Sequence, residues 1–192
     1  MPRYSKEKRE QLTDQMRSAI RTSFARLCAE TGDVSMERVA QDAGIAKGTI
    51  YLYYKTKLEL IRDVLNANRE IMLARIEEMI KTTNPPEEQL RLYARIMMEE
   101  FQKNRHLRTE FIRSSGLPAL PRNIRGIEML NCILQSGIER GVFRPVPVED
   151  TVTFIRASLI GQFRCLLMER KNIDIERAMN VFEDMVLRAL KK

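Results

Sequence analysis

The sequence predicts an all-α protein of about nine helices, divided into a small N-terminal domain and a larger C-terminal one. In nearly every segment the apolar residues recur with the helical period, and no convincing run alternates between apolar and polar residues as a half-buried strand would. Glycine, proline and asparagine gather at the breaks between these segments. The chain has 192 residues, of which 44% are hydrophobic and 31% are charged, so it can bury a sizeable core.

The N-terminal part of the chain predicts one long helix followed by two short ones. The long helix carries an apolar stripe and should end at Gly32, because glycine readily adopts the left-handed conformation found at helix C-termini. Ser35 is a suitable N-cap for the first short helix, and Gly44 separates this helix from the second. The stripe of the long helix consists of Leu12, Met16, Ala19, Ile20, Ser23, Phe24 and Leu27.

A capping box formed by Thr56 and Glu59 predicts a fourth, long helix at residues 56–82. The sequence Asn84-Pro85-Pro86 ends it, since proline cannot continue a helix but suits the first turn of a new one. We therefore expect one domain at residues 1–55 and a second at 56–192, with the fourth helix linking the two. Further helices are expected at 87–103, 105–115, 122–140, 148–170 and 174–190.

The two short helices form a candidate helix-turn-helix within the sequence SMERVAQDAGIAKGTIYLYY. In that motif one helix braces against the phosphate backbone of DNA and the second enters the major groove. Gly44 permits the left-handed turn, and Val39, Ile45 and Ile50 would form a small shared core beside the small side chain of Ala40. Spacing alone also fits an ordinary helical hairpin.

The longer string RVAQDAGIAKGTIYLYYKTKLELI resembles the DNA-binding segment of TetR-family transcriptional regulators. The resemblance covers roughly residues 10–70, with the motif at about 34–53, and beyond it only the size and the helical pattern match. It implies that residues 1–55 bind DNA and that residues 56–192 bind an effector and dimerise. Ala46 departs from the family, which often has Ser or Thr there. The recognition helix therefore lacks a side-chain N-cap, which is typically worth about 1 kcal/mol.

Helical geometry separates the side chains of the recognition helix by face. Ile50 and Tyr54 face the bracing helix, so we expect Tyr54 in the core. On the other side Tyr51 and Leu52 would contact bases, and Gly48 would let the helix approach the DNA closely. Phosphate contacts are expected from Thr49, Tyr53 and Lys57, whereas Lys47 could contact either phosphates or bases. The complete set of expected DNA-binding residues is Lys47, Gly48, Thr49, Tyr51, Leu52, Tyr53 and Lys57.

The helix at 148–170 is apolar on two faces, so it should be buried on two sides. Its large residues on one face are Val152, Ile155, Leu159, Phe163 and Leu166. Small residues line the other face. The resemblance to the family implies that this helix and the last one form a four-helix dimer interface with their copies, so that two recognition helices reach half-sites about one turn of DNA apart. The expected interface residues are Ala157, Gly161, Cys165, Phe182 and Met185.

The family also keeps its ligand pocket in the C-terminal domain, and this region is rich in methionine, which adapts to irregular apolar partners. Ordinary core packing would explain the same methionines. Asn68 and Arg156 interrupt apolar stripes and need polar partners, either within the protein or on a ligand. If Arg156 pairs with a ligand, that ligand should be anionic. The expected ligand-binding residues are Asn68, Met72, Met97, Phe101, Phe111, Met129, Arg156 and Phe163.

The sequence does not predict catalysis, a metal site or a cofactor. Cys28, Cys132 and Cys165 are widely spaced, and His106 is the only histidine. No nucleophile–base pair or phosphate-binding glycine loop indicates an enzyme. No apolar run approaches the ~20 residues of a membrane span, and the N-terminus lacks the pattern of a signal peptide, so we expect a cytoplasmic protein.

We therefore expect a sequence-specific DNA-binding transcriptional regulator, most simply a homodimeric repressor that a small-molecule inducer releases from a palindromic operator. The net charge of +7 is densest in residues 1–57, which suits a polyanionic partner such as double-stranded DNA, and a solvated terminus would explain it equally well. The alternative is a ligand-independent DNA-binding or partner-binding dimer whose C-terminal domain serves only for dimerisation or docking. A fully packed C-terminal core would favour the alternative, whereas a cavity of several hundred Å³ would favour a ligand.

Overall fold

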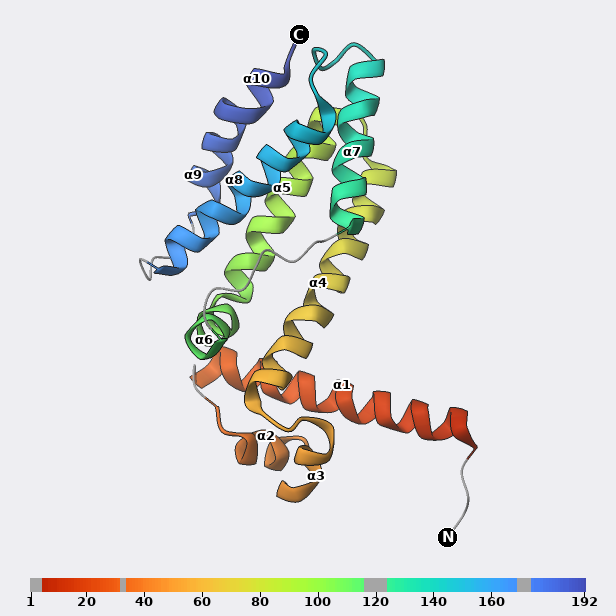
Figure 1. Cartoon of the computed structure of the whole chain (residues 1–192), viewed down its shortest axis with the longest axis vertical. Helices are drawn as coiled ribbons and strands as arrows, with labels where there is room; N and C mark the ends of the chain where they lie inside the picture. The colour runs from red at the N-terminus through yellow and green to blue at the C-terminus, as the bar shows by residue number, and fades with distance from the viewer. Residues whose placement is uncertain (1–4, 32–33, 116–123, 169–173) are drawn as a thin grey trace. The chain divides into compact units, whose positions relative to one another are not determined.

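The computed structural model describes residues 5–31, 34–115, 124–168 and 174–192 and is helical almost throughout these ranges (Figure 1). The helices are α1 (Lys6–Thr31), α2 (Met36–Asp42), α3 (Lys47–Tyr53), α4 (Lys57–Thr82), α5 (Pro86–Lys103), α6 (Arg105–Ser115), α7 (Ile124–Glu139), α8 (Val148–Met168), α9 (Ile175–Phe182) and α10 (Arg188–Leu190). In the described ranges the β-structure is limited to an isolated bridge between Phe143 and Lys191. The all-α prediction is thus confirmed.

The predicted helices correspond closely to the observed ones, with one difference in the last of them. The predicted helix at 174–190 contains a π-helical turn, η1 (Glu183–Leu187), between α9 and α10. The apolar pattern gives no sign of this turn, since one extra residue in a helical turn shifts the following side chains by a single position. Gly32 and the side chain of Leu166, for which we made predictions, lie outside the residues and side chains that the structure describes.

The helices form two compact units. Unit 1 comprises Met1–Ala67 and His106–Leu117, and unit 2 comprises Asn68–Arg105 and Pro118–Lys192. α4 contributes its first part to unit 1 and its second part to unit 2, and almost all of α6 belongs to unit 1. The boundary expected after residue 55 therefore falls within unit 1, because the early turns of α4 pack against the N-terminal helices.

Unit 1 is built around the C-terminal half of α1. The stripe predicted for α1 is buried from Ile20 onward, whereas Leu12 is 45% exposed. The two short helices α2 and α3 have only seven residues each and cannot cover the whole length of the 26-residue α1. The core of unit 1 consists of Ile20, Phe24, Leu27, Cys28, Val34, Met36, Val39, Ala40, Ile50, Tyr54, Leu60, Ile61, Val64 and Leu107.

Unit 2 packs α5 against α7, α8 and α9. The rings of Phe101 and Phe163 stack at 3.9 Å between centroids and join α5 to α8. Gly137 allows the ring of Phe143 to lie directly on α7, since a Cβ at this position would be 2.0 Å from a ring carbon. No helix in the described parts of the chain is both long and apolar enough to cross a bilayer.

Candidate DNA-binding site

The turn between α2 and α3 has the local geometry that its sequence predicts. The hydroxyl of Ser35 accepts a hydrogen bond of 3.3 Å from the backbone N–H of Arg38 and caps α2. Gly44 adopts a φ of +68°, which a residue with a side chain rarely adopts. The backbone N–H of Ile45 then donates to the carbonyl of Ala40 at 2.9 Å, which turns the chain toward α3.

The α3 helix is held by its inner face. Ile50 is fully buried and Tyr54, which follows the helix, is 2% exposed, so both lie in the core of unit 1 as predicted. Ala46 occupies the N-cap position and makes no side-chain capping bond, which was also expected. Because the helix is seven residues long, its position depends on this inner face rather than on its own stability.

Tyr54 belongs to a polar network that the sequence did not predict. Its hydroxyl donates a hydrogen bond of 2.5 Å to Asp63 of α4, and Arg21 of α1 lies 3.3 Å from the same carboxylate oxygen. The guanidinium of Arg17 lies over the Tyr54 ring at 5.1 Å from its centroid. Burial of the phenol and its bond to Asp63 raise the pKa of Tyr54 well above its ordinary value. The network fixes the end of α3 to α1 and α4.

The outer face of α3 is open. Leu52 is 75% exposed, and a Cβ added at Gly48 would meet no atom within 4 Å. Thr49 is half-buried, and the half-buried rings of Tyr51 and Tyr53 pack against the core of unit 1. Leu52 and Gly48 therefore offer the surface expected of groove-facing residues, while the tyrosines present mainly their polar edges.

A carboxylate of α2 lies among the side chains expected to bind DNA. Glu37 accepts an ion-paired hydrogen bond from the Nζ of Lys47 at 2.9 Å and a second bond from the hydroxyl of Tyr51 at 3.4 Å. The contact with Lys47 lowers the pKa of Glu37, and the same contact raises the pKa of Lys47. Glu37 and Lys47 are therefore both charged at neutral pH, and the lysine charge is balanced locally.

Lys57, the other expected lysine, is the first residue of α4, and its Nζ lies 3.6 Å from Glu110 of α6. The N-terminus of α4 is capped by Thr56, whose hydroxyl accepts from the backbone N–H of Glu59 at 3.1 Å. Glu59 accepts from the N–H of Lys55 at 2.7 Å, one residue before the position in a standard capping box. The cap fixes the first turn of α4, which carries Lys57.

The residues expected to bind a ligand do not all lie together. Phe111 packs against the core of unit 1, whereas the other seven belong to unit 2. Met72, Phe101 and Phe163 are buried, and Met97, Met129 and Arg156 are half-buried. Asn68 donates to Asn104 at 2.6 Å, and Asn104 donates to the backbone carbonyl of Glu100 at 2.9 Å. Asn68 thus has a partner inside the protein, which is one of the two outcomes expected for it.

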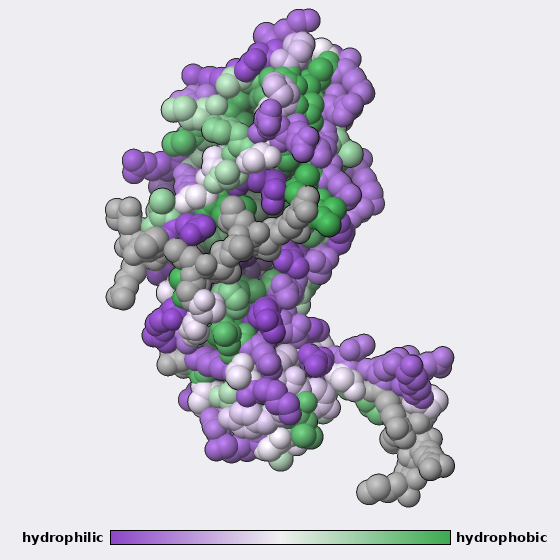
Figure 2. Space-filling view, in the orientation of Figure 1, coloured by the Kyte–Doolittle hydropathy of each residue, from purple (hydrophilic) through white to green (hydrophobic). Residues whose placement is uncertain are grey.

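An apolar surface covers part of α8 and the C-terminal helix. Ala157 and Cys165 are exposed, Gly161 is half-buried with open space around it, and Met185 is 69% exposed. Phe182 is 4% exposed, so it belongs to the core of its own protomer rather than to the outer surface. The surface that unit 2 presents in Figure 2 carries hydrophobic residues among hydrophilic ones.

Two exposed apolar residues of this surface were missed from the sequence. Phe154 is 62% exposed and precedes Ala157 by three positions, which places it on the small-residue face of α8. Val181 is 47% exposed and lies four positions before Met185. Helical spacing from the predicted residues would have found both.

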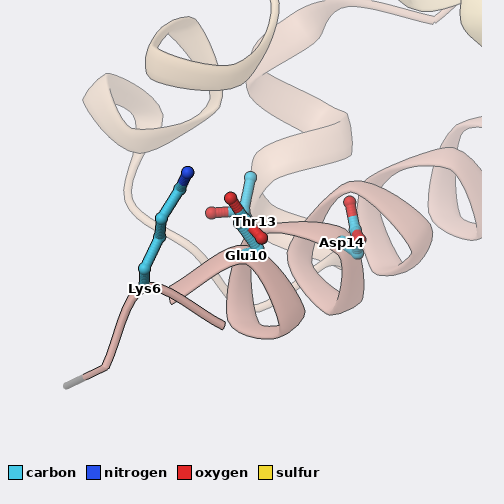
Figure 3. Close-up of a pocket in the computed structure, with 4 residues that line it drawn as sticks. All are labelled: Lys6, Glu10, Thr13 and Asp14. Carbon is cyan, nitrogen blue, oxygen red and sulfur yellow. The ribbon is translucent and has the colours of Figure 1, made fainter. Parts of the chain in front are cut away.

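Other surface features offer little chemistry. An open depression along α1 is lined by the exposed residues Lys6, Glu10, Thr13 and Asp14 (Figure 3). Its lining mixes both charges and contains no apolar side chain, so it has the composition of an ordinary helix surface. Within the described ranges no group of His, Cys, Asp and Glu residues has the arrangement of a metal site.

Comparison with known proteins places this geometry in context. Residues 25–64, from the end of α1 to the start of α4, match the family described as "Bacterial regulatory proteins, tetR family". The chain is 28% identical over 130 residues to the HTH-type transcriptional repressor KstR2 of Mycolicibacterium smegmatis, and the match covers 62% of each protein. It thus spans somewhat less than two thirds of that relative.

Solved structures resemble the chain over nearly its whole length. The ketosteroid transcriptional regulator KstR2 of Mycobacterium tuberculosis matches with a TM-score of 0.64 and 22% identity, covering 92% of this chain and 95% of that one. The transcriptional regulator FadR of Bacillus subtilis, solved in complex with stearoyl-CoA, matches with a TM-score of 0.67 and 20% identity, covering 90% and 98%. At these identities the structural matches establish the fold.

Proposed function

Because the chain belongs to the TetR family of DNA-binding transcriptional regulators, we propose that it acts as a homodimeric repressor that a small molecule releases from a palindromic operator. The observation that carries the proposal is the α2–turn–α3 motif, with a buried inner face at Ile50 and Tyr54 and an open outer face at Gly48 and Leu52. A helix held on one side and open on the other is suited to the major groove. The family membership identifies the chain as a regulator rather than an enzyme.

In the proposed complex, α3 divides its contacts between bases and phosphates. Leu52 would make apolar contact with bases, and the polar edge of Tyr51 would reach a base or a phosphate. Thr49, Tyr53 and Lys57 would bind phosphates and fix the register of the helix on the DNA. Lys47 has an exposed ammonium group and can serve either role. The protein would act in the cytoplasm, where the operator lies.

A dimer is supported by the apolar surface of α8 and the C-terminal helix. Phe154 and Met185 are both more than 60% exposed, although each is large and apolar. A soluble protomer gains free energy by covering such residues, and a second copy offers a matching surface related by two-fold symmetry. Gly161, with open space around it, would allow the two α8 helices to approach closely.

An apolar ligand in unit 2 is supported by the names of relatives and by the composition of that unit. One similar solved structure is named a ketosteroid transcriptional regulator, and another was solved with stearoyl-CoA, a molecule that has a long apolar acyl chain. The residues of unit 2 that we expect to contact a ligand are mostly methionine and phenylalanine. α4 contributes its first part to unit 1 and its second part to unit 2. A ligand that displaced the second part would also shift Asp63 in the first part, and Asp63 binds Tyr54 at the end of α3.

The DNA-binding proposal is tested by selecting duplexes from a random pool with the purified full-length protein. The expected result is enrichment of an inverted repeat, bound by two protomers per duplex in analytical ultracentrifugation. Tyr51→Phe, which keeps the ring packed against unit 1 and removes the hydroxyl, should fold normally and weaken this selection. Enrichment of no sequence, or of a site without two-fold symmetry, would contradict the proposal.

The ligand proposal is tested with the selected duplex in hand, using stearoyl-CoA and a ketosteroid as separate probes. One of them should raise the midpoint of thermal unfolding and release the protein from the duplex. If neither probe changes either quantity, and the purified protein carries no small molecule in native mass spectrometry, the ligand-independent alternative is supported instead.

A further inference from the structure

The carboxylate of Glu37 occupies an unusual place for a protein that binds a polyanion. Glu37 is the second residue of α2, and its Oε1 contacts two successive turns of α3, through Lys47 at 2.9 Å and Tyr51 at 3.4 Å. Both partners belong to the set of residues expected to contact DNA. A negative charge thus lies within the surface that would face the phosphates.

This carboxylate remains charged under ordinary conditions. Its hydrogen bond with Lys47 is the largest cause that lowers the pKa of Glu37, and the same bond raises the pKa of Lys47. The Lys47 side chain is 69% exposed and that of Glu37 is 45% exposed, so water screens the pair and it can separate when another partner approaches. In the free protein the positive charge of Lys47 is therefore balanced by Glu37, while its side chain stays free to move to another partner.

We propose that Glu37 is a specificity-determining residue of the DNA-binding surface, and this inference rests on the proposed DNA-binding function. Contacts with phosphates are available on every duplex, and they supply most of the affinity for random sequences. By balancing Lys47 and repelling phosphates, Glu37 lowers that common part of the affinity. Through its contacts with both side chains, it also keeps the ammonium of Lys47 and the hydroxyl of Tyr51 side by side on the surface that would face the groove.

The test compares Glu37→Gln with wild type on two duplexes. One is a duplex that wild-type protein selects from a random pool, and the other is a scrambled duplex of the same length and base composition. For Glu37→Gln we expect several-fold tighter binding to the scrambled duplex and a smaller gain on the selected one, so the ratio of the two affinities falls. The salt dependence of binding to the scrambled duplex should steepen by up to about 0.9 in log–log slope, the value for one additional phosphate contact.

Glu30→Gln is a matched control. Glu30 pairs with Arg26 at 3.1 Å on α1, is exposed like Glu37, and its substitution changes the net charge by the same amount. If the effect came from net charge alone, Glu30→Gln would reproduce it. An equal change of the affinity ratio in both variants therefore overturns the inference.

A second variant, Lys47→Gln, tests the same pair from the lysine side. Lys47→Gln should weaken binding to the scrambled duplex by a smaller factor when Glu37 is present than in the Glu37→Gln background, where the lysine is released to phosphates. Equivalently, Glu37→Gln should have a smaller effect in the Lys47→Gln background than in wild type. Equal effects of each substitution in both backgrounds overturn the inference.

The outcomes separate this inference from the proposed function. If wild-type protein binds the selected and scrambled duplexes equally, the proposed function fails and the inference fails with it. If wild type discriminates and Glu37→Gln discriminates equally well, the proposed function stands and only the role of Glu37 is overturned.

Discussion

The hydroxyl of Tyr54 donates a hydrogen bond of 2.5 Å to Asp63, and this contact joins the end of α3 to α4. Tyr54 is 2% exposed, and the carboxylate of Asp63 also forms an ion pair with the guanidinium of Arg21, with 3.3 Å between nitrogen and oxygen. A phenol that is buried beside an ionised carboxylate makes a stronger hydrogen bond than one between neutral groups. The position of the recognition helix therefore depends on a polar contact as well as on apolar packing.

Tyr54→Phe should remove this bond while keeping the ring in the core. Hydrogen bonds to charged groups contribute about 1.5–3 kcal/mol, so the free energy of unfolding should fall by that amount in urea denaturation. Tyr53→Phe, which changes a half-buried tyrosine next to it in the sequence, should cost less than about 0.5 kcal/mol. Equal losses in the two variants would mean that the Tyr54–Asp63 contact contributes nothing specific.

The same contact predicts a dependence of stability on alkaline pH. Burial and the bond to Asp63 raise the pKa of Tyr54 above its ordinary 10.0, and burial raises the pKa of Tyr93 to about 12. A tyrosine whose pKa is raised on folding adds stability that is complete below pH 10 and is lost as the pH rises toward the folded value.

The free energy of unfolding should therefore decrease between pH 10 and 12, and the decrease should be shallower in Tyr54→Phe. The difference between the two proteins should change by at most about 1.4 kcal/mol per pH unit, which is the value for one proton. Denaturant unfolding at a series of pH values measures it. Parallel curves for wild type and variant would show that Tyr54 does not titrate differently in the two states.

Lys57 should contribute to the binding of every duplex without selecting among them. Lys57→Ala should weaken binding to selected and scrambled DNA by similar factors and lower the salt slope by about 0.9. Because Glu110 lies 3.6 Å from the Lys57 ammonium, Glu110→Gln should have the opposite effect on affinity. Fluorescence anisotropy at several salt concentrations tests both variants, and an unchanged slope in Lys57→Ala would remove Lys57 from the set of phosphate contacts.

Gly161→Leu should convert the proposed dimer into a monomer. Inside the protomer an added side chain at Gly161 meets no atom within 4 Å of its Cβ, so the variant should keep its fold. If two α8 helices pack closely at this point, the leucine would force them apart. Gln135→Leu, which adds leucine to an exposed position of α7, is the control. Light scattering that shows a dimer for Gly161→Leu would place the interface elsewhere.

The sequence was most informative where local chemistry determines the structure. Ser35 caps α2, Gly44 makes the left-handed turn, and Tyr54 is buried, all as predicted. Each of these features depends on residues within a few positions or on the helical period. The resemblance to the family then identified the class of regulator from the same short segment.

The sequence was least informative where residues from different elements meet. Glu37 contacts Lys47 and Tyr51 only because α2 and α3 cross at a particular angle, and Lys57 meets Glu110 because α6 packs in unit 1. No period or motif encodes these pairs. Phe182 was expected at the dimer interface, but it shares the buried face of α9 with Ala178 and Met179 in its own protomer.

Glycine at position 48 is not required by the fold of the protomer, but it suits close approach by a partner. Alanine at this position, the second of α3, would touch nothing in the protein and would favour the helix by at most about 1 kcal/mol over glycine. The protomer thus gives up stability at a site where it gains no packing in return. The variant Gly48→Ala adds one methyl group and so tests how closely α3 approaches the groove. We expect its midpoint of thermal unfolding to rise and its affinity for DNA to fall.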